Sequence, residues 1–176
     1  MKTKSILLVA ALTCATSIFA APPASPKANV EVIFDHPENF TDVKDSDFGT
    51  DKGRDGILGV IKDYLVERAP RHLAEGQTLT ITFTDIDLAG DFEPWRGPDF
   101  NHVRIVKEIY PPRLNFSYKL ADANGAVVKE GTEKLLEMGF QMTTSPIDNQ
   151  DSLRYEKAML DNWLRNKFPK PKKAGK

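Results

Sequence analysis

The sequence has 176 residues, of which 40% are hydrophobic, and its formal net charge is −1 at pH 7. This length favours a single domain with a buried core, and the nearly balanced charge excludes a general attraction to nucleic acid or to anionic lipid. Cys14 is the only cysteine, which excludes an internal disulfide and cysteine-based zinc sites.

The first residues have the order of a secretory signal peptide. Lys2 and Lys4 are followed by an uncharged, mostly apolar run over residues 5–19 and then by Ala20 and Ala21. This run is shorter than the roughly 20 apolar residues of a membrane span, which disfavours the alternative of an uncleaved membrane anchor. We therefore expect cleavage near Ala20-Ala21 and a periplasmic or secreted protein of a bacterial envelope.

Cleavage would change both the chemistry and the charge of the chain. Removal of 20 of the 176 residues would leave 156, without Cys14 and with a net charge of −3, since two lysines and no acids are lost. The processed chain would have no transmembrane segment and no thiol. Thiol-based redox chemistry is excluded for such a protein.

Apolar periodicity predicts a folded domain over residues 30–168, after a flexible proline-containing leader at 21–29. Alternating apolar residues over 30–34 predict a first strand. Residues 36–56 are polar and rich in Asp and Gly, which is typical of a long loop. Helical spacing of apolar residues then predicts an amphipathic helix over 55–69.

Residues 78–88 have the clearest strand pattern in the chain. Apolar residues take the odd positions up to Phe83 and the even positions from Ile86 onward. This change of parity has two explanations: a β-bulge near Asp85, or a strand end that is covered on both faces.

The second half of the domain is predicted to contain three strands and a helix. Alternation predicts strands over 103–110 and 113–121, and the Asn-Gly pair in residues 122–125 predicts a hairpin turn. A return strand over 126–140 and an amphipathic helix over 151–168 follow.

These elements, in the order β-α-β-β-β-β-α, predict an α+β fold. The hairpin favours a mainly antiparallel sheet of about five strands, and two amphipathic helices can cover one face of it. We expect a basic, disordered tail at residues 169–176.

Four stretches of the chain together resemble a family of small exported bacterial proteins catalogued only as a domain of unknown function. The resemblance covers nearly all of the expected mature chain. It implies export and a single domain, and it implies no activity, cofactor or site residue. The stretches that carry it are VEVIF (30–34), TDIDLAGDFEPW (84–95), VRIVKEIYPPR (103–113) and YEKAML (155–160).

An acidic segment around Gly90 is the most suggestive candidate site. Asp85, Asp87, Asp91 and Glu93 lie within nine positions at the end of a strong strand. Oxygen ligands in such a cluster are what Ca²⁺ prefers, so the segment is a candidate Ca²⁺ site, although it lacks the pattern of an EF-hand loop. The alternative is a solvated loop whose acids pair with nearby arginines.

The same carboxylates suggest one enzymatic alternative, a carboxylate-dependent hydrolase of the periplasm. The chain has no nucleophile elbow, no zinc-protease motif and no glycine-rich phosphate loop, and its three histidines are far apart in sequence. No cofactor-binding motif is present. These observations favour a non-enzymatic binding or accessory module of the envelope.

Aromatic residues just after the acidic segment are the candidate contact surface for a partner. Phe92, Trp95 and Phe100 lie among prolines and glycines, in what we expect to be a loop. Aromatic side chains on a loop can anchor an envelope protein or a ligand, and they can equally fold under the loop to close the core. An exposed edge of the sheet is the other surface through which such a module could bind.

Overall fold

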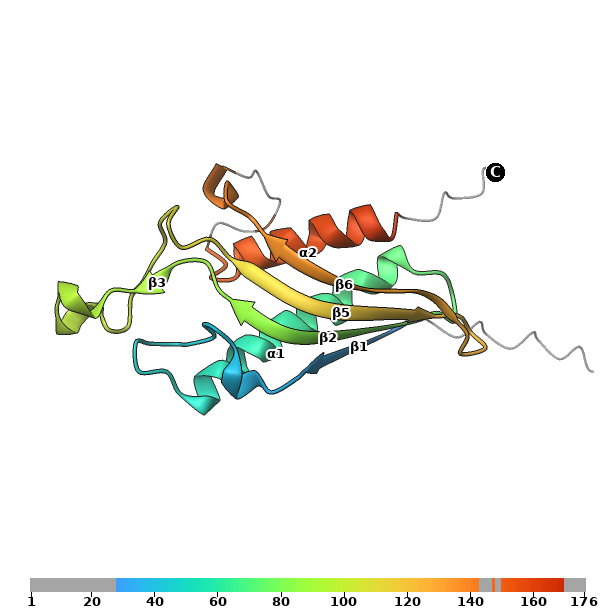
Figure 1. Cartoon of the computed structure of the whole chain (residues 1–176), viewed down its shortest axis with the longest axis horizontal. Coiled ribbons are helices and arrows are strands. Elements are labelled where there is room, and N and C mark those ends of the chain that lie inside the picture. Colours follow the sequence, from blue (N-terminus) through green and yellow to red (C-terminus); the bar gives the residue numbers. More distant parts are fainter. Residues whose placement is uncertain (1–27, 143–146, 148–149, 170–176) are drawn as a thin grey trace, which may run out of the picture.

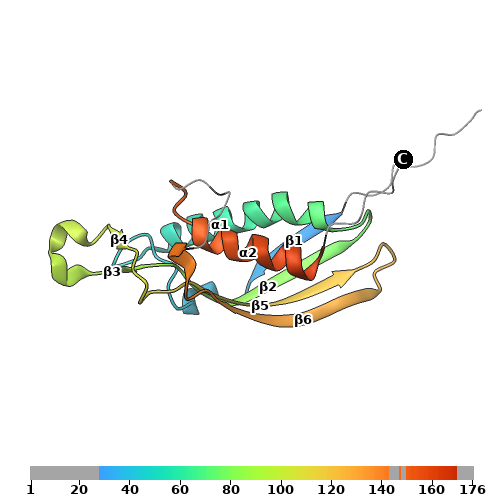
Figure 2. The same ribbon diagram turned by 90° about the horizontal axis from the view of Figure 1, so that it is seen from above.

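The computed structural model describes residues 28–142, 147 and 150–169. Their main elements form two layers, with both long helices on one face of a sheet (Figures 1 and 2). These elements are β1 (Asn29–Phe34), α1 (Asp51–Arg68), β2 (Thr78–Asp87), β5 (Arg113–Ala121), β6 (Val127–Leu136) and α2 (Arg154–Lys167). Two short strands lie outside the layers, β3 (Asp91–Phe92) and β4 (Arg104–Ile105). The described 3-10 helices are η1 (Pro37–Asn39), η2 (Ala69–His72), η3 (Pro94–Arg96), η4 (Pro98–Phe100) and η5 (Phe140–Met142).

The main sheet has four strands in the order β1-β2-β5-β6. β1 runs parallel to β2, and α1 makes the crossover between them. The β2–β5 and β5–β6 pairs are antiparallel. The expected α+β fold is confirmed, with a mixed sheet of four strands and a separate two-stranded β3–β4 ribbon in place of a single, mainly antiparallel sheet of about five strands.

β2 is buried in the pattern that its alternation predicts. Leu79, Ile81 and Phe83 are fully buried. The register against β5 then shifts between Phe83 and Asp85, and Ile86 beyond the shift is fully buried as well. The β-bulge is therefore the correct explanation for the change of parity.

α1 begins earlier than the sequence predicts, at Asp51 instead of Asp55. Thr50 is the N-cap, and its hydroxyl accepts a hydrogen bond of 2.8 Å from the backbone N–H of Gly53. Such a cap stabilises a helix by about 1 kcal/mol. Gly53 lies in the first turn, and because glycine is unfavourable in helices, the sequence predicted a loop for residues 51–54. The buried face of the helix is the predicted one: Leu58, Ile61 and Leu65.

α2 lies within the predicted range and is fixed to the sheet by aromatic contacts. The ring of Trp163 packs edge-on against Phe116 and Tyr118 of β5, with centroid distances of 4.8 and 5.6 Å. Each such pair contributes about 0.5–1.5 kcal/mol beyond simple burial. None of the helices in the described part of the chain has both the length and the apolarity to span a membrane.

The predicted strand over 103–110 is wrong, since only Arg104–Ile105 forms a strand there. Residues 90–110 form a projection, here called the arm, which extends beyond the end of the two layers (Figure 2). The backbone N–H of Gly90 donates to the carbonyl oxygen of Tyr110 at 3.1 Å and closes the base of the arm. The return strand is also shorter than predicted, because β6 ends at Leu136.

Candidate functional site

The root of the arm requires glycine and is tied to α2. Gly90 has a φ of +81°, and a Cβ at this position would lie 2.8 Å from the carbonyl oxygen of Ile105. The neighbouring Ala89 N–H donates to Glu156 Oε1 of α2 at 2.7 Å. Burial raises the pKa of Glu156, whose Oε2 has no hydrogen-bond partner in the described part of the chain. The root of the arm is thus fixed by the conformation of Gly90 and by a hydrogen bond to α2.

Glu93 is the centre of an ionic cluster inside the arm. Its side chain is 1% exposed and accepts hydrogen bonds from Arg96 Nε and Lys107 Nζ, and from Tyr110 Oη at 3.2 Å. The Lys107 ammonium is the main cause that lowers the pKa of Glu93 to about 2, and Arg96 and Tyr110 add to this effect. Glu93 is therefore ionised at neutral pH and joins the outgoing segment of the arm to its returning segment.

Arg104 joins the arm to the segment before α1. Its guanidinium donates to both carboxylate oxygens of Asp42, at 2.7 and 3.1 Å, and to the carbonyl oxygen of Lys44 at 3.1 Å. A fourth acceptor atom is the carbonyl oxygen of Gly90 at 2.9 Å, and the guanidinium carbon lies 4.6 Å from the ring centroid of Phe92. Bidentate pairing between a guanidinium and a carboxylate fixes the orientation of the two side chains as well as stabilising their contact.

The four carboxylates of the predicted Ca²⁺ site each have separate protein partners. Asp85 accepts hydrogen bonds from the N–H of Thr41 at 2.8 Å and from its hydroxyl at 3.1 Å. Asp87 lies 3.9 Å from Arg113 Nε, and burial raises its pKa. Asp91 accepts from the backbone N–H that follows it, and Glu93 lies in its ionic cluster.

These four side chains do not gather around one point. Within the described residues, no group of three or more His, Cys, Asp or Glu side chains is placed to hold a metal ion. Calcium binding by Asp85, Asp87, Asp91 and Glu93 stays a prediction. The ionised Glu93 is not suited to the proton-donor role that the hydrolase alternative requires, since a general acid needs a raised pKa.

The three candidate contact aromatics have different environments. Phe92 is buried beneath Arg104, and the ring of Phe100 lies 5.9 Å from the guanidinium carbon of Arg96. Trp95 is 72% exposed. The arm therefore presents one large aromatic ring to solvent, on a base that its own ion pairs hold in place. Exposed apolar side chains elsewhere on the arm are Val103, Val106 and Ile109.

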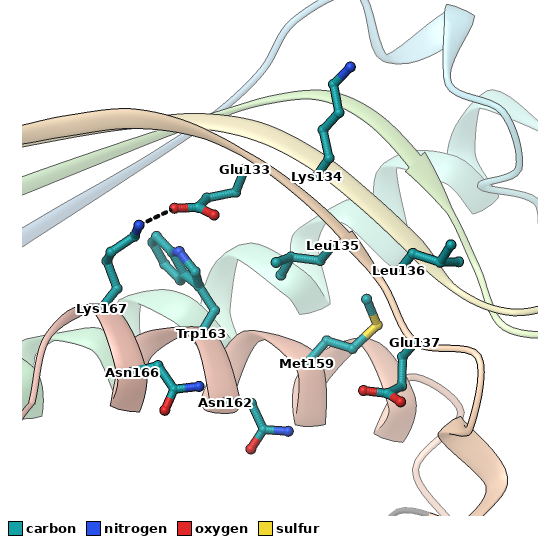
Figure 3. Close-up of a pocket in the computed structure, with 10 residues that line it drawn as sticks. All are labelled: Glu133, Lys134, Leu135, Leu136, Glu137, Met159, Asn162, Trp163, Asn166 and Lys167. Atoms are coloured by element: carbon teal, nitrogen blue, oxygen red, sulfur yellow. Dashed lines mark ion pairs between the residues drawn. The ribbon is translucent and has the colours of Figure 1, made fainter.

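A groove between β6 and α2 is a feature that the sequence analysis did not identify. Its cavity volume is about 410 Å³, and its walls are residues 133–137 on one side and Met159, Asn162, Trp163, Asn166 and Lys167 on the other (Figure 3). An ion pair of 2.6 Å between Lys167 Nζ and Glu133 Oε1 bridges the two walls. A tertiary contact of this kind leaves no signal in local periodicity.

Comparison with known proteins agrees with the resemblance noted in the sequence. The sequence model of a family described as "Protein of unknown function (DUF3016)" matches residues 28–166. No curated protein and no solved structure matches the chain. The matched range begins just before β1 and ends within α2, so it includes both layers and the arm. The chain belongs to the DUF3016 family.

Proposed function

We propose that this protein is an exported, non-enzymatic binding module that contacts a partner protein of the bacterial envelope through Trp95. The observation that carries the proposal is the exposure of Trp95 on an arm that the ion pairs of Glu93 and Arg104 hold in place. An aromatic ring left in solvent loses the stabilisation that burial would provide, about 1.5–3 kcal/mol for a large apolar side chain. Large aromatic residues are also enriched among those that dominate the energy of protein interfaces.

The surroundings of Trp95 support a contact role over a flexible loop. Glu93, two residues before Trp95, is buried and ion-paired. Arg96, the residue after Trp95, is one of its partners. The ring therefore projects from backbone that is held on both sides. A rigid support of this kind reduces the entropy that a contact residue loses on binding.

Photo-cross-linking in cells tests the proposal. A benzophenone amino acid replaces the exposed Asp99 of η4, beside Trp95 on the arm, and the adducts formed on irradiation are compared with and without the change Trp95→Ala. We expect a discrete adduct with one envelope protein, and a decrease of roughly tenfold or more when Trp95 is lost.

Met142→Ala is the matched control, because Met142 is 86% exposed on η5, outside the arm. It should leave the adduct unchanged. Equal adduct yields from the wild type and Trp95→Ala, with the melting temperature unaltered, would overturn the proposal.

A further inference from the structure

We propose that two copies of this chain associate along β6, in antiparallel register with Thr132 opposite Thr132, so that their two sheets join into one. β6 is an edge strand, because the sheet order ends with it. An edge strand presents unpaired N–H and C=O groups that can pair with another strand. The inference concerns a surface separate from the arm and does not depend on the function proposed for Trp95.

The hydrogen bonds of β6 to β5 show which backbone groups reach the open edge. The N–H of Glu137 donates to the carbonyl oxygen of Pro112, at the end of the ladder beyond Leu136. In an antiparallel ladder, hydrogen-bonded and non-hydrogen-bonded residues alternate. The odd-numbered residues from 131 to 137 therefore point their backbone groups toward β5. Residues 130, 132, 134 and 136 point theirs away from it.

This alternation limits the ways in which two copies of β6 can pair. An edge-facing residue must lie opposite another edge-facing residue, so the numbers of opposed residues add up to an even value. Pairing Lys129 with Lys134 and Glu130 with Glu133, which would oppose like charges, is therefore not allowed. Centring the pair on Thr132 instead places Glu130 of each copy opposite Lys134 of the other.

Contacts already formed within the chain favour this register over the one centred on Gly131. The alternative would rely on Lys129 and Glu133, and both already contact Lys167 of the same chain, at 2.8 Å to its carbonyl oxygen and 2.6 Å to its Nζ. Glu130 and Lys134 are exposed and form no ion pair with any described residue. They are available to a second copy.

Exposed apolar side chains flank the charged pairs along β6. Val128 is 57% exposed and Leu136 is 52% exposed. The register centred on Thr132 brings Leu136 of each copy level with Val128 of the other. Val128 lies at the shift in the β5–β6 register, near the start of β6. The order of exposed side chains at positions 128, 130, 132, 134 and 136 is therefore self-complementary when reversed: apolar, acidic, Thr, basic, apolar.

A single engineered thiol tests the register. In a Cys14→Ala background, which has no other cysteine, Thr132→Cys places two sulfurs on directly opposed residues. Hydrogen-bonded antiparallel pairs have Cα atoms about 5.5 Å apart, within the range of roughly 4.4–6.8 Å that a disulfide spans. We expect mild oxidation to convert the purified protein to a covalent dimer.

Glu130→Cys is the matched control, because its cysteines would be offset by four residues, about 13 Å along the strands. It should form no covalent dimer under the oxidising conditions in which Thr132→Cys forms one. Equal disulfide yields from the two variants would indicate random collision and would overturn the register.

Charge exchange tests the association itself by sedimentation or light scattering. Glu130→Lys opposes like charges twice across the two-fold axis, and should raise the dissociation constant of the dimer roughly 10- to 100-fold. The double change Glu130→Lys with Lys134→Glu restores opposite charges and should recover association. A wild-type protein that stays monomeric at its highest soluble concentration, or that pairs β6 with a different chain, would overturn the proposal.

Discussion

Glu93 shows how a buried carboxylate can stabilise a projection that has little core of its own. Burial alone would raise the pKa of a carboxyl group and favour its neutral form. Here the hydrogen bonds from Lys107, Arg96 and Tyr110 outweigh burial, and the pKa falls to about 2. The sequence marked Glu93 as part of an acidic segment. It could not show the burial, because two of these donors lie 14 and 17 residues further along the chain.

The low pKa of Glu93 predicts an acid-sensitive contribution to stability. The pKa is about 2 in the folded protein and near its ordinary value of 4.5 in the unfolded chain. A carboxyl with a depressed folded pKa contributes its full stabilisation above pH 4.5 and loses it as the pH falls toward 2. Glu93→Gln should therefore lower the melting temperature most at neutral pH, and the difference from the wild type should shrink between pH 4.5 and 2.

Thermal unfolding monitored by circular dichroism at several pH values checks this prediction. Asp99→Asn serves as the control, since Asp99 is exposed on the same arm and should change little at any pH. A difference between Glu93→Gln and the wild type that is constant with pH would show that the carboxylate charge is not what stabilises the arm.

Elements whose signals are local could be predicted from the sequence, and elements that depend on distant contacts could not. The alternation of β2 and the Asn124-Gly125 turn act over a few residues, and both are in the structure as expected. The strand predicted over 103–110 fails because the chain must turn after Ile105 for Lys107 and Tyr110 to reach Glu93. That requirement is tertiary and leaves no period in the sequence.

Gly90 is the position in the arm where a single methyl group should have the largest effect. Gly90→Ala combines a positive φ with a close approach to a backbone carbonyl, which cannot move aside as a flexible side chain can. We expect the free energy of unfolding to decrease by about 2 kcal/mol. Urea denaturation monitored by fluorescence measures the change.

Gly59→Ala is the matching change in a regular element. Gly59 lies within α1, and no atom outside the local helix lies within 4 Å of a Cβ built there. Alanine should raise the free energy of unfolding by about 0.5–1 kcal/mol, because it is the better helix former. If both variants shift stability in the same direction, the conformational argument for Gly90 is wrong.

At the scale of the whole molecule, the two proposed contact surfaces lie on different parts of the fold. The arm extends from one end of the layers, and β6 forms a lateral edge of the sheet (Figures 1 and 2). A dimer joined along β6 would therefore leave each arm accessible to a partner. The sequence suggested the aromatic residues and an exposed sheet edge as contact surfaces. That the edge is β6, and how two copies of β6 would align, could be inferred only from the order of the strands in the sheet.

Export is a property of the whole chain and has its own test. If the signal peptide is read correctly, the protein recovered from the periplasmic fraction begins at Ala21 and has lost Cys14. Intact-mass measurement and N-terminal sequencing give the answer directly. A product that retains Met1, or that stays with the cytoplasmic fraction, would contradict the assignment.

The closed base of the arm has a consequence for how quickly a partner can bind. The Gly90–Tyr110 hydrogen bond, the Arg104–Asp42 pair and the Glu156–Ala89 contact are all formed by folding, before any encounter. Recognition through Trp95 would then proceed by conformational selection of a state that is already dominant. Its association rate would be limited by diffusion and orientation, without a preceding rearrangement of the arm.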